Sequence, residues 1–457
     1  MNFELSEDQQ LLRDTFARFL NAESSTERVR AALPSGFDPA LWSGLAELGA
    51  FSLRVPAEAG GVGLGLLDAV VLMEEVGRTL ASGPIAETLI AASVLARLDA
   101  GRHGDLLNRV LAGKAVITLA FHDVAAEPLQ WVPGGAVAEA VIARDGDKVV
   151  LIPVGDNDRR SEPNLASTPV AQLRLGSLAR QTLSAEEQGR RVFTQALEEW
   201  KLLIAAALAG LSREALELAS TYARERVAFG QPIGTYQGIS HPLADLLCDV
   251  DGGKYLTWRT LRDIADRKEQ AAAQISLCAW WNADAASRTV AQALHTFGGY
   301  GLTTEYDIHL FNLRAKAWPL VLGDPARLLE EAGRRLYAGE TTVLPDVGEV
   351  SIDFDLGEEA RALARELDEF FTKNITPELR AKAHYSFDGH DPGIHRKLAQ
   401  AGLLFPGWPK EWGGRAAPPF ALSAASHVWE AHGWTGHVMG VSNMVGTIIR
   451  RFGTDVL

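Results

Sequence analysis

The sequence predicts a mainly α-helical protein with a small β domain between two helical domains, followed by a second helical domain of the first type. Helical patterns fill residues 1–112 and 184–337, and short runs of β-forming residues fill the stretch between them. An internal repeat then places a second copy of the first domain at 351–457. At about 100–200 residues per domain, a chain of 457 residues has room for this arrangement.

The first domain, residues 1–112, is predicted from three helical patterns. The stretch LSEDQQLLRDTFARFLN is amphipathic, and Ser6 stands where a helix N-cap is expected. Two further helical patterns follow at 66–81 and 84–98. The glycine-rich stretch GGVGLG at 60–65 is interpreted as a loop before a helix, because no strand precedes it as a nucleotide-binding loop would require.

A reduced middle β domain is expected at 113–183. The runs KAVITLAFHD, AVAEAVIARDGDKVVLIPV and VAQLRLGSL are β-type, and Asp-Gly-Asp in the second of them predicts a hairpin turn. Long helical patterns return at 184–337 and predict a C-terminal helical bundle. The segment 338–350, which contains glycine and proline and has no helical period, is predicted to be a linker to the domain at 351–457.

The repeat rests on two matching blocks. LAELGAFSLRVPAEAGGVG matches LAQAGLLFPGWPKEWGGRA without a gap, and Pro56 pairs with Pro409, which lies 353 residues later. Upstream, FELSEDQQLLRDTFARFL matches FDLGEEARALARELDEFF at a distance of 351 residues. The repeated unit is therefore as long as a whole multidomain polypeptide. Because the second unit receives only about a hundred residues, we expect this chain to be the front part of a longer tandem protein.

Composition and charge exclude some classes of protein. Hydrophobic residues make up 47% and charged residues 22%, as in ordinary globular proteins, and the formal net charge is −14. This acidic balance argues against nucleic-acid binding, which needs clustered Lys and Arg. The N-terminus MNFELSEDQQ has acidic residues where a signal peptide needs basic ones. The sequence has no uninterrupted apolar run of about 18 residues, so no membrane-spanning helix is expected.

The cysteines and histidines do not predict a metal or redox site. Cys248 and Cys278 lie within helical patterns and are expected to be buried apolar residues. The absence of a disulfide framework fits a reducing cytoplasm, which is the location we expect. His427, His432 and His437 are spaced by five residues, which turns successive side chains by about 140° around a helix, so they do not share a face.

Two motifs in the C-terminal bundle carry a resemblance to a known family. RERVAFGQPIGTYQGISHPLADL (224–246) resembles the flavin-binding signature of acyl-CoA dehydrogenases, and ALHTFGGYGLTTEYDIHLFNLRAKAW (293–318) resembles their second signature. The helix, sheet, helix order of the domains is similar to that family as well. The resemblance implies an acyl-CoA dehydrogenase-like fold, with an N-terminal helical domain, a middle β domain and a C-terminal four-helix bundle. It also implies FAD as cofactor.

In that family FAD lies between neighbouring units. The resemblance implies that Arg226 grips the FAD pyrophosphate, that Phe229 packs against the adenosine end, and that Gln237 hydrogen-bonds nearby. The full set of residues that it assigns to cofactor binding is Arg226, Phe229, Gln237, His295, Gly298 and Gly299. The flavin-ring motifs of the family's β domain are missing, since only Glu127-Pro128 remains of one of them. The first unit is therefore expected to donate FAD contacts without holding a flavin of its own.

The apolar stretch AKAWPLVLGD (315–324) raises the question of the catalytic base. Most of the family has a Glu at the position where this sequence has Leu322, and Leu cannot accept a proton. Asp324 lies two residues later, before Pro325, and is interpreted as a cap of the next helix. Some family members carry the base on another helix, so a distant Glu stays open. We therefore predict no catalytic residue in the first unit.

The sequence as a whole predicts an FAD-dependent acyl-CoA dehydrogenase of the tandem, fused two-unit type. The resemblance extends to actinobacterial enzymes that oxidise bulky acyl-CoAs, including steroid side chains. It implies an acyl-CoA substrate, electron transfer to an electron-transfer flavoprotein, and a homodimer of the tandem chain. The catalytic base is expected in the rest of the second unit. The alternatives are a non-catalytic scaffold or binding protein of the same fold, and a flavin-dependent oxidase or nitroalkane-type enzyme.

Overall fold

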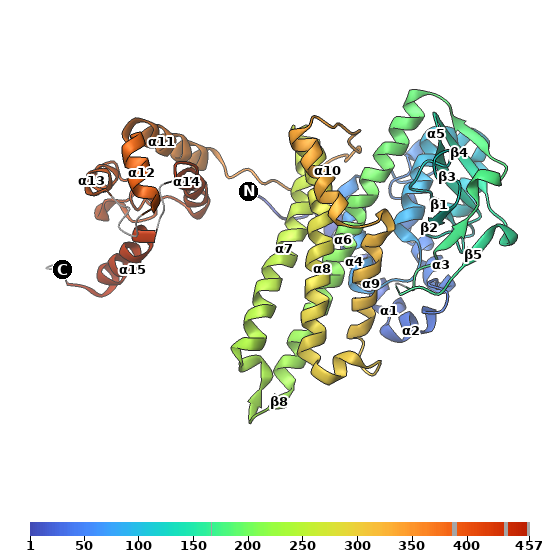
Figure 1. The fold of residues 1–457 in the computed structure, drawn as a ribbon, viewed down its shortest axis with the longest axis horizontal. Helices are drawn as coiled ribbons and strands as arrows, with labels where there is room; N and C mark the ends of the chain where they lie inside the picture. The colour runs from blue at the N-terminus through green and yellow to red at the C-terminus, as the bar shows by residue number, and fades with distance from the viewer. Residues whose placement is uncertain (166, 386–390, 434–436, 455–457) are drawn as a thin grey trace. The chain divides into compact units, whose positions relative to one another are not determined.

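The computed structural model describes residues 1–165, 167–385, 391–433 and 437–454. The chain forms two compact units (Figure 1). The large unit is Glu4–Ile352, and the small unit joins Met1–Phe3 to the residues from Asp353 onward. The predicted fold class is confirmed, because helices dominate both units and all strands but those of one short hairpin gather in one part of the large unit.

The first part of the large unit is helical. It contains α1 (Glu7–Glu23), α2 (Thr26–Ala32), α3 (Pro39–Glu47), α4 (Leu66–Arg78) and α5 (Ile85–Leu111). The predicted cap of α1 is confirmed: Ser6 Oγ accepts from the Gln9 amide at 3.2 Å, and the Gln9 side chain accepts from the Ser6 amide. This reciprocal pair satisfies two amides that a helix start leaves free. Phe16 and Leu20 on α1 are buried.

The middle part contains two small sheets. Their strands are β1 (Ile117–Leu119), β2 (Gln130–Val132), β3 (Ala140–Asp145), β4 (Lys148–Pro153), β5 (Arg159–Ser161), β6 (Ala171–Leu173) and β7 (Gln181–Ser184). One sheet has the order β1-β3-β4-β7 and the other β2-β6-β5. The predicted hairpin is confirmed, because Asp145 pairs with Lys148 across a turn at Gly146-Asp147. Val141 and Val150 point into the core that the two sheets share.

A long helical bundle completes the large unit. It consists of α6 (Glu187–Glu225), the hairpin β8 (Val227–Ala228) and β9 (Gln231–Pro232), α7 (Gln237–Ala265), α8 (Ala271–Phe297), α9 (Ile308–Ala317) and α10 (Ala326–Tyr337). Figure 1 shows α6, α7 and α8 side by side along most of their length, with the β8–β9 hairpin at one end. Alanine and leucine side chains of α6 and α8 form the core between them.

The helical part and the bundle meet where α4 crosses α6. A Cβ atom on Gly77 of α4 would lie 1.8 Å from the carbonyl oxygen of Ala207, and one on Gly210 of α6 would lie 1.9 Å from that of Glu74. Glycine at both positions is therefore what lets the two backbones touch. The Glu74 carboxylate also reaches α7, where it accepts a hydrogen bond from Trp258 Nε1 at 2.7 Å.

The segment predicted to be a linker has neither helix nor strand, but it is packed onto the large unit. The Leu66 amide at the start of α4 donates to the Val347 carbonyl at 2.8 Å, and the Gln195 side chain on α6 donates to the Leu344 carbonyl at 2.9 Å. Arg54, which forms a buried ion pair with Glu199, also donates to a backbone carbonyl of the segment. The backbone carbonyls of the segment therefore connect α4 with α6 through hydrogen bonds.

The small unit contains α11 (Glu358–Asn374), α12 (Pro377–Tyr385), α13 (Pro392–Gln400), α14 (Pro419–Ala431) and α15 (His437–Phe452). Its first residues pair with the N-terminus of the chain: Asn2 forms an antiparallel bridge with Asp353, and the rings of Phe3 and Phe354 lie 4.8 Å apart. These pairs join residues that occupy equivalent places in the two repeats.

The repeated Pro-x-Glu-x-Gly-Gly loops have the same local structure. In each, a 3₁₀ turn follows the proline, and the first glycine adopts a left-handed conformation, with φ of 86° at Gly60 and 79° at Gly413. A Cβ atom on the second glycine would lie 2.0 Å from a carbonyl oxygen at Gly61 and 2.1 Å from one at Gly414. Both copies of the loop therefore need glycine at the same two positions.

One prediction about the cysteines is wrong. Cys278 is buried as expected, and burial raises the pKa of its thiol to about 12, but Cys248 on α7 is exposed. A helical pattern alone does not show on which face of a helix a residue lies. Among the described residues no group of side chains is arranged to hold a metal ion, and His432 hydrogen-bonds to Asp368 instead. The side chain of His437 lies outside the described residues.

We predict that Gly77→Ala and Gly210→Ala each lower the free energy of unfolding by about 3 kcal/mol, because the added methyl forces α4 and α6 apart. Urea unfolding of the purified chain measures this. Gly333→Ala on α10 is the matched control. Its new methyl meets no atom within 4 Å, so it should leave stability unchanged or raise it by about 1 kcal/mol. Equal effects at all three positions would contradict the close crossing.

Candidate functional site

The structure brings the predicted cofactor residues to one end of the bundle. The ring of Tyr222, near the end of α6, stacks on Phe297 at the end of α8 with 4.3 Å between the ring centroids. The β8–β9 hairpin leaves α6 at the same point, where the Arg226 amide donates to the Tyr222 carbonyl at 2.8 Å. α7 begins immediately after the hairpin, at Gln237. We refer to this region as the hairpin end of the bundle.

Two of the predicted residues are notable for their exposure. Phe229 is 97% exposed and has φ of +54°, a conformation that a bulky side chain adopts only at a cost. Its only ring contact among the described residues is a distant edge contact with Tyr236, 6.4 Å away. Arg226 is exposed too, and its guanidinium makes no ion pair within the described part of the chain. An exposed cation and an exposed aromatic ring are suited to binding a ligand.

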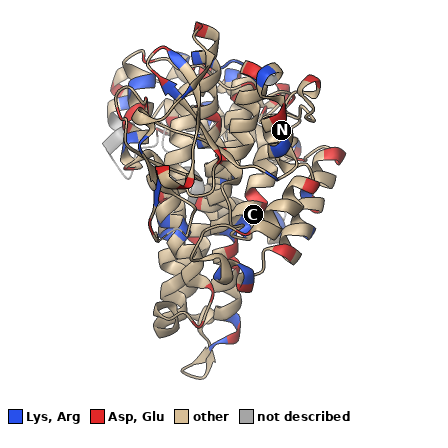
Figure 2. Cartoon of the chain, turned by 90° about the vertical axis from the view of Figure 1, so that its right-hand side faces the viewer, with Lys and Arg blue, Asp and Glu red and all other residues tan. Residues whose placement is uncertain are grey.

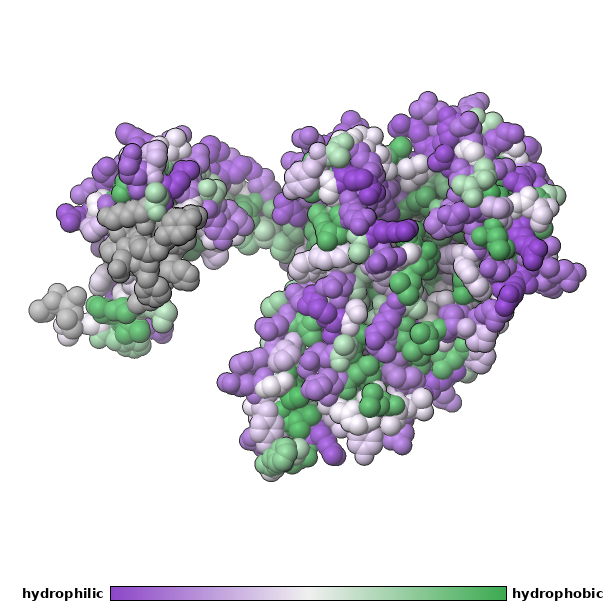
Figure 3. All heavy atoms as spheres, viewed as in Figure 1, coloured by the Kyte–Doolittle hydropathy of each residue, from purple (hydrophilic) through white to green (hydrophobic). Residues whose placement is uncertain are grey.

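The remaining predicted residues are equally open. Gln237 and His295 are exposed, and His295 lies in the last turn of α8. Gly298 has φ of +60°, and a Cβ atom on Gly298 or Gly299 would meet no atom within 4 Å. A ligand could therefore approach this backbone closely. Figure 3 shows apolar side chains at the hairpin end, where Leu302 is 90% exposed.

The face seen in Figure 2 carries no basic stripe of the kind that binds nucleic acid. Figure 2 shows Lys and Arg interspersed with Asp and Glu over the face in view, without a continuous basic stripe. Of the helices that the structure describes, each is too short or too polar to cross a bilayer.

The predicted base position carries no acid. Leu322 ends the 3₁₀ helix η7 (Trp318–Leu322) and lines a cavity of about 280 Å³ together with Lys201 and Glu331. The interpretation of Asp324 as a cap is confirmed, because its Oδ1 accepts from the Ala326 amide at 2.9 Å, where α10 begins. The Asp324 carboxylate is thus occupied by the start of a helix.

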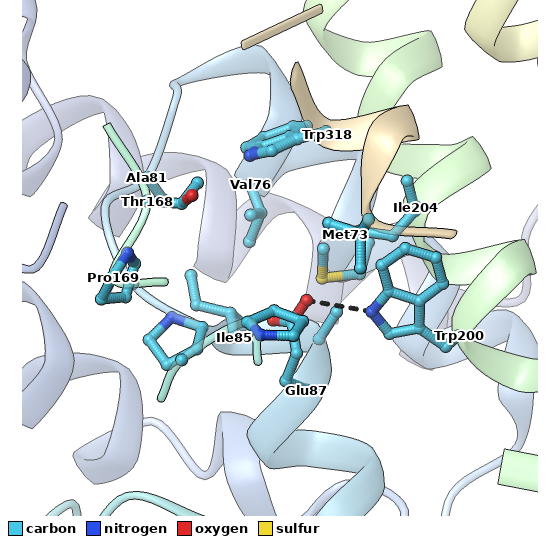
Figure 4. Close-up of a pocket in the computed structure, with 16 residues that line it drawn as sticks. Met73, Val76, Ala81, Ile85, Glu87, Thr168, Pro169, Trp200, Ile204 and Trp318 are labelled. Carbon is cyan, nitrogen blue, oxygen red and sulfur yellow. Dashed lines mark hydrogen bonds between the residues drawn. The ribbon is translucent and has the colours of Figure 1, made fainter. Parts of the chain in front are cut away.

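The other side of η7 lines a second cavity, where the three parts of the large unit meet. Trp318 and Val321 form one wall, and the helices α4 and α6 supply Met73 and Trp200 (Figure 4). The middle part supplies two short loops, at 133–134 and 168–169. The cavity measures about 40 Å³, and we refer to it as the junction cavity. The apolar stretch at 315–324 therefore forms a wall of the junction cavity.

Sequence reasoning missed Glu87, the acidic residue of the junction cavity. It lies in the first turn of α5 and is 8% exposed, and Trp200 Nε1 donates to its Oε1 at 2.9 Å. Burial raises the pKa of the Glu87 carboxyl, although the hydrogen bond from Trp200 opposes this shift. Lys and Arg are absent from the residues that line the cavity. The only signal in the sequence is one acidic residue within the apolar run PIAETLIAASVLARL.

Arg314 on α9 is a second buried charge that the sequence did not reveal. Its guanidinium donates to the carbonyls of Leu80 and Ala81 and to Ser82 Oγ, all in the turn between α4 and α5. Burial lowers the pKa of Arg314 to about 9. Leu80 has φ of +52°, so the arginine holds the turn in a conformation that it would otherwise disfavour. This turn sets the course of α5 and hence the position of Glu87.

Comparison with known families supports this architecture. The family model described as "Acyl-CoA dehydrogenase, C-terminal domain" matches residues 187–337. The model described as "Acyl-CoA dehydrogenase, N-terminal domain" matches twice, at 6–101 and 357–457. The second match coincides with the second copy predicted from the repeat.

Individual relatives are similar over most of the chain. Acyl-CoA dehydrogenase IpdE2 of Mycolicibacterium smegmatis is 33% identical over 346 residues, which cover 73% of this chain and 99% of IpdE2. Acyl-CoA dehydrogenase FadE34 of Mycobacterium tuberculosis is 28% identical over 390 residues, which cover 83% of this chain and 50% of FadE34.

Among solved structures, the ChsE4-ChsE5 complex from Mycobacterium tuberculosis matches with a TM-score of 0.66 and 26% identity, over 75% of this chain and 100% of the matched chain. The Tcur3481-Tcur3483 steroid ACAD matches with a TM-score of 0.65 and 26% identity, over 74% of this chain and 99% of that one. Together with the fold and the double domain match, these similarities show that the chain belongs to the acyl-CoA dehydrogenase family of oxidoreductases.

Proposed function

We propose that this chain forms part of a tandem, FAD-dependent acyl-CoA dehydrogenase, in which the large unit donates cofactor contacts and the second unit carries the proton chemistry. The observation that carries this proposal is the contrast between the hairpin end and the junction cavity of the large unit. The hairpin end is open and offers an exposed arginine, an exposed ring and accessible glycine backbone. The junction cavity, at about 40 Å³, is too small for a three-ring flavin.

The residues at the hairpin end fit the phosphate and adenosine end of FAD. The planar guanidinium of Arg226 matches phosphate oxygens, and Phe229 offers an aromatic face for stacking. Gly298 and Gly299 leave the backbone open to a close approach. FAD would supply the hydride acceptor for α,β-dehydrogenation. Because Arg226 and Phe229 are exposed among the described residues, the cofactor would be shared with another unit, in the tandem chain or in its homodimer.

The proton step needs a base that the large unit does not place at η7. Removing an α-proton from a thioester requires a positioned acceptor, and Leu322 has none. Asp324 Oδ1 is used to cap α10. The base would therefore come from the second unit, of which residues 357–457 match the N-terminal domain.

The substrate and partners follow from the relatives and the family. One similar structure is titled a steroid ACAD, so we propose a bulky acyl-CoA, with a steroid side chain as one example. We further propose that electrons pass to an electron-transfer flavoprotein and that the protein works in the cytoplasm, where its two free cysteines stay reduced. The alternative, a non-catalytic scaffold of the same fold, would give a colourless tandem protein that takes up no FAD on refolding.

We predict that Arg226→Ala lowers the affinity of the tandem protein for FAD at least tenfold, because a charged hydrogen bond to phosphate is lost, and that Phe229→Ala lowers it about as much. Fluorescence titration of the apoprotein with FAD measures both. Arg160→Ala, at an exposed arginine of β5, is the matched control and should leave the affinity unchanged. Unchanged affinity in all three variants would remove the hairpin end from the cofactor site.

We also predict that Leu322→Ala leaves kcat of the tandem enzyme within about twofold, since no proton passes through this residue. Asp324→Asn should leave stability almost unchanged, because Asn keeps the oxygen that caps α10 and is about as good a cap as Asp, and its effect on kcat should be similarly small. Steady-state kinetics and thermal unfolding separate the two effects. A loss of kcat by about 10²-fold or more in Asp324→Asn without loss of stability would identify Asp324 as the base.

A further inference from the structure

The β8–β9 hairpin turns through two residues, and one of them is unusual at that place. Ala228 pairs with Gln231, so Phe229 and Gly230 form the whole loop. Both have positive φ, +54° at Phe229 and +86° at Gly230, as a type I′ turn requires. Asn, Asp and Gly are the usual first residues of such a turn, because a bulky side chain is strained there. Phenylalanine at this position therefore strains the turn.

Packing of the Phe229 ring within the chain does not offset this strain. Phe229 is 97% exposed, and its only ring contact among the described residues is the edge contact with Tyr236 at 6.4 Å. The hairpin is also short, with two pairs of strand residues, and a two-stranded ribbon of this size is not stable by itself. Strained backbone persists only where its surroundings fix it, and such residues gather at ligand sites. The turn therefore needs a restraint from outside the two strands.

The phenol of Tyr236, the residue directly before α7, supplies this restraint. Its hydroxyl donates to the carbonyl of Ala228 at 3.1 Å, and the carbonyl oxygen of Phe229 lies 3.5 Å from the same hydroxyl. These carbonyls belong to the two peptide groups on either side of the Phe229 Cα atom, whose orientations set the φ and ψ of Phe229. Tyr236 is itself held in place, because its amide donates to the Ile233 carbonyl at 3.1 Å. One hydroxyl group thus connects the tip of the hairpin to the start of α7.

We propose that Tyr236 is a positioning residue for the cofactor, whose hydroxyl group holds the turn so that the ring of Phe229 is in place before FAD binds. This inference rests on the proposed function, in which Phe229 packs against the adenosine end of FAD. A ring on an unrestrained turn would lose conformational entropy on binding, whereas a turn that folding has already fixed loses less. Tyr236 acts through the backbone of Phe229 and needs no contact with the cofactor.

Tyr236→Phe tests this role, because it removes the hydroxyl group and keeps the ring. We expect the affinity of the tandem protein for FAD to fall about fivefold in fluorescence titration of the apoprotein, as for the loss of one neutral hydrogen bond. When Phe229→Ala is already present, the same substitution should have no further effect, because the ring that it positions is gone. Tyr337→Phe is the matched control and should leave the affinity unchanged, since Tyr337 is an exposed tyrosine on α10, outside the hairpin end.

A second measurement observes the turn without the cofactor. Hydrogen–deuterium exchange of the apoprotein, followed by mass spectrometry, should be faster at residues 226–233 in Tyr236→Phe than in the unmodified protein, because the hairpin opens more often without its restraint. Tyr337→Phe should exchange at the unmodified rate over the same residues. Unchanged exchange in Tyr236→Phe overturns the proposal, because the hydroxyl group would then not be what holds the turn.

The results of the titrations separate this inference from the proposed function. Suppose that Tyr236→Phe, shown to be folded by circular dichroism, binds FAD as well as the unmodified protein, while Arg226→Ala and Phe229→Ala bind it more weakly. The inference is then overturned and the proposed function stands. An equal loss with and without the Phe229 ring also overturns it, because Tyr236 would then act independently of that ring. Unchanged affinity in all these variants overturns both.

Discussion

The large unit depends on the glycine crossing between α4 and α6. Gly77 and Gly210 let the two backbones touch, and the same two helices carry Met73 and Trp200 into the junction cavity on either side of the contact. A side chain at the crossing would move these walls apart together. The packed segment that follows α10 also joins α4 and α6, through the carbonyls of Val347 and Leu344. One short backbone contact therefore fixes the distance between the helical domain and the bundle.

Buried charged side chains also help to fix the positions of the helices in the large unit. Arg335 on α10 pairs with Glu198 on α6 and with Glu331, and Lys201 joins the same two carboxylates. Each charge in this network has an opposite neighbour, which is the condition under which buried ions are tolerated. Arg314 is different, since only neutral oxygens surround its guanidinium. Its effect is to specify one conformation of a turn, and through that turn the start of α5.

Features that depend on local sequence could be predicted. The cap at Ser6, the hairpin at Gly146 and the cap at Asp324 all follow from residues within a few positions of one another. The repeat could also be recognised in the sequence, because both copies of the loop need glycine where a side chain would collide with a backbone carbonyl.

The junction cavity could not be predicted, because its lining comes from stretches that lie far apart in the sequence. Glu87 and Trp200 are 113 residues apart, and Arg314 bonds to Ala81 across 233. No helical period reveals such pairs, just as none revealed that Cys248 faces outward. The predicted cofactor residues cluster at one end, but their role depends on a surface that another unit must cover, and this stays a prediction.

The pairing at the start of the small unit has a thermodynamic meaning. Asn2 bridges Asp353 and Phe3 meets Phe354, so each partner is the counterpart of the other in the repeat. Two separate chains would form such a contact only by mass action and would lose it on dilution. In one chain the partners are tethered, and their effective concentration is set by the length of polypeptide between them. Because both partners belong to one chain, this contact does not depend on protein concentration.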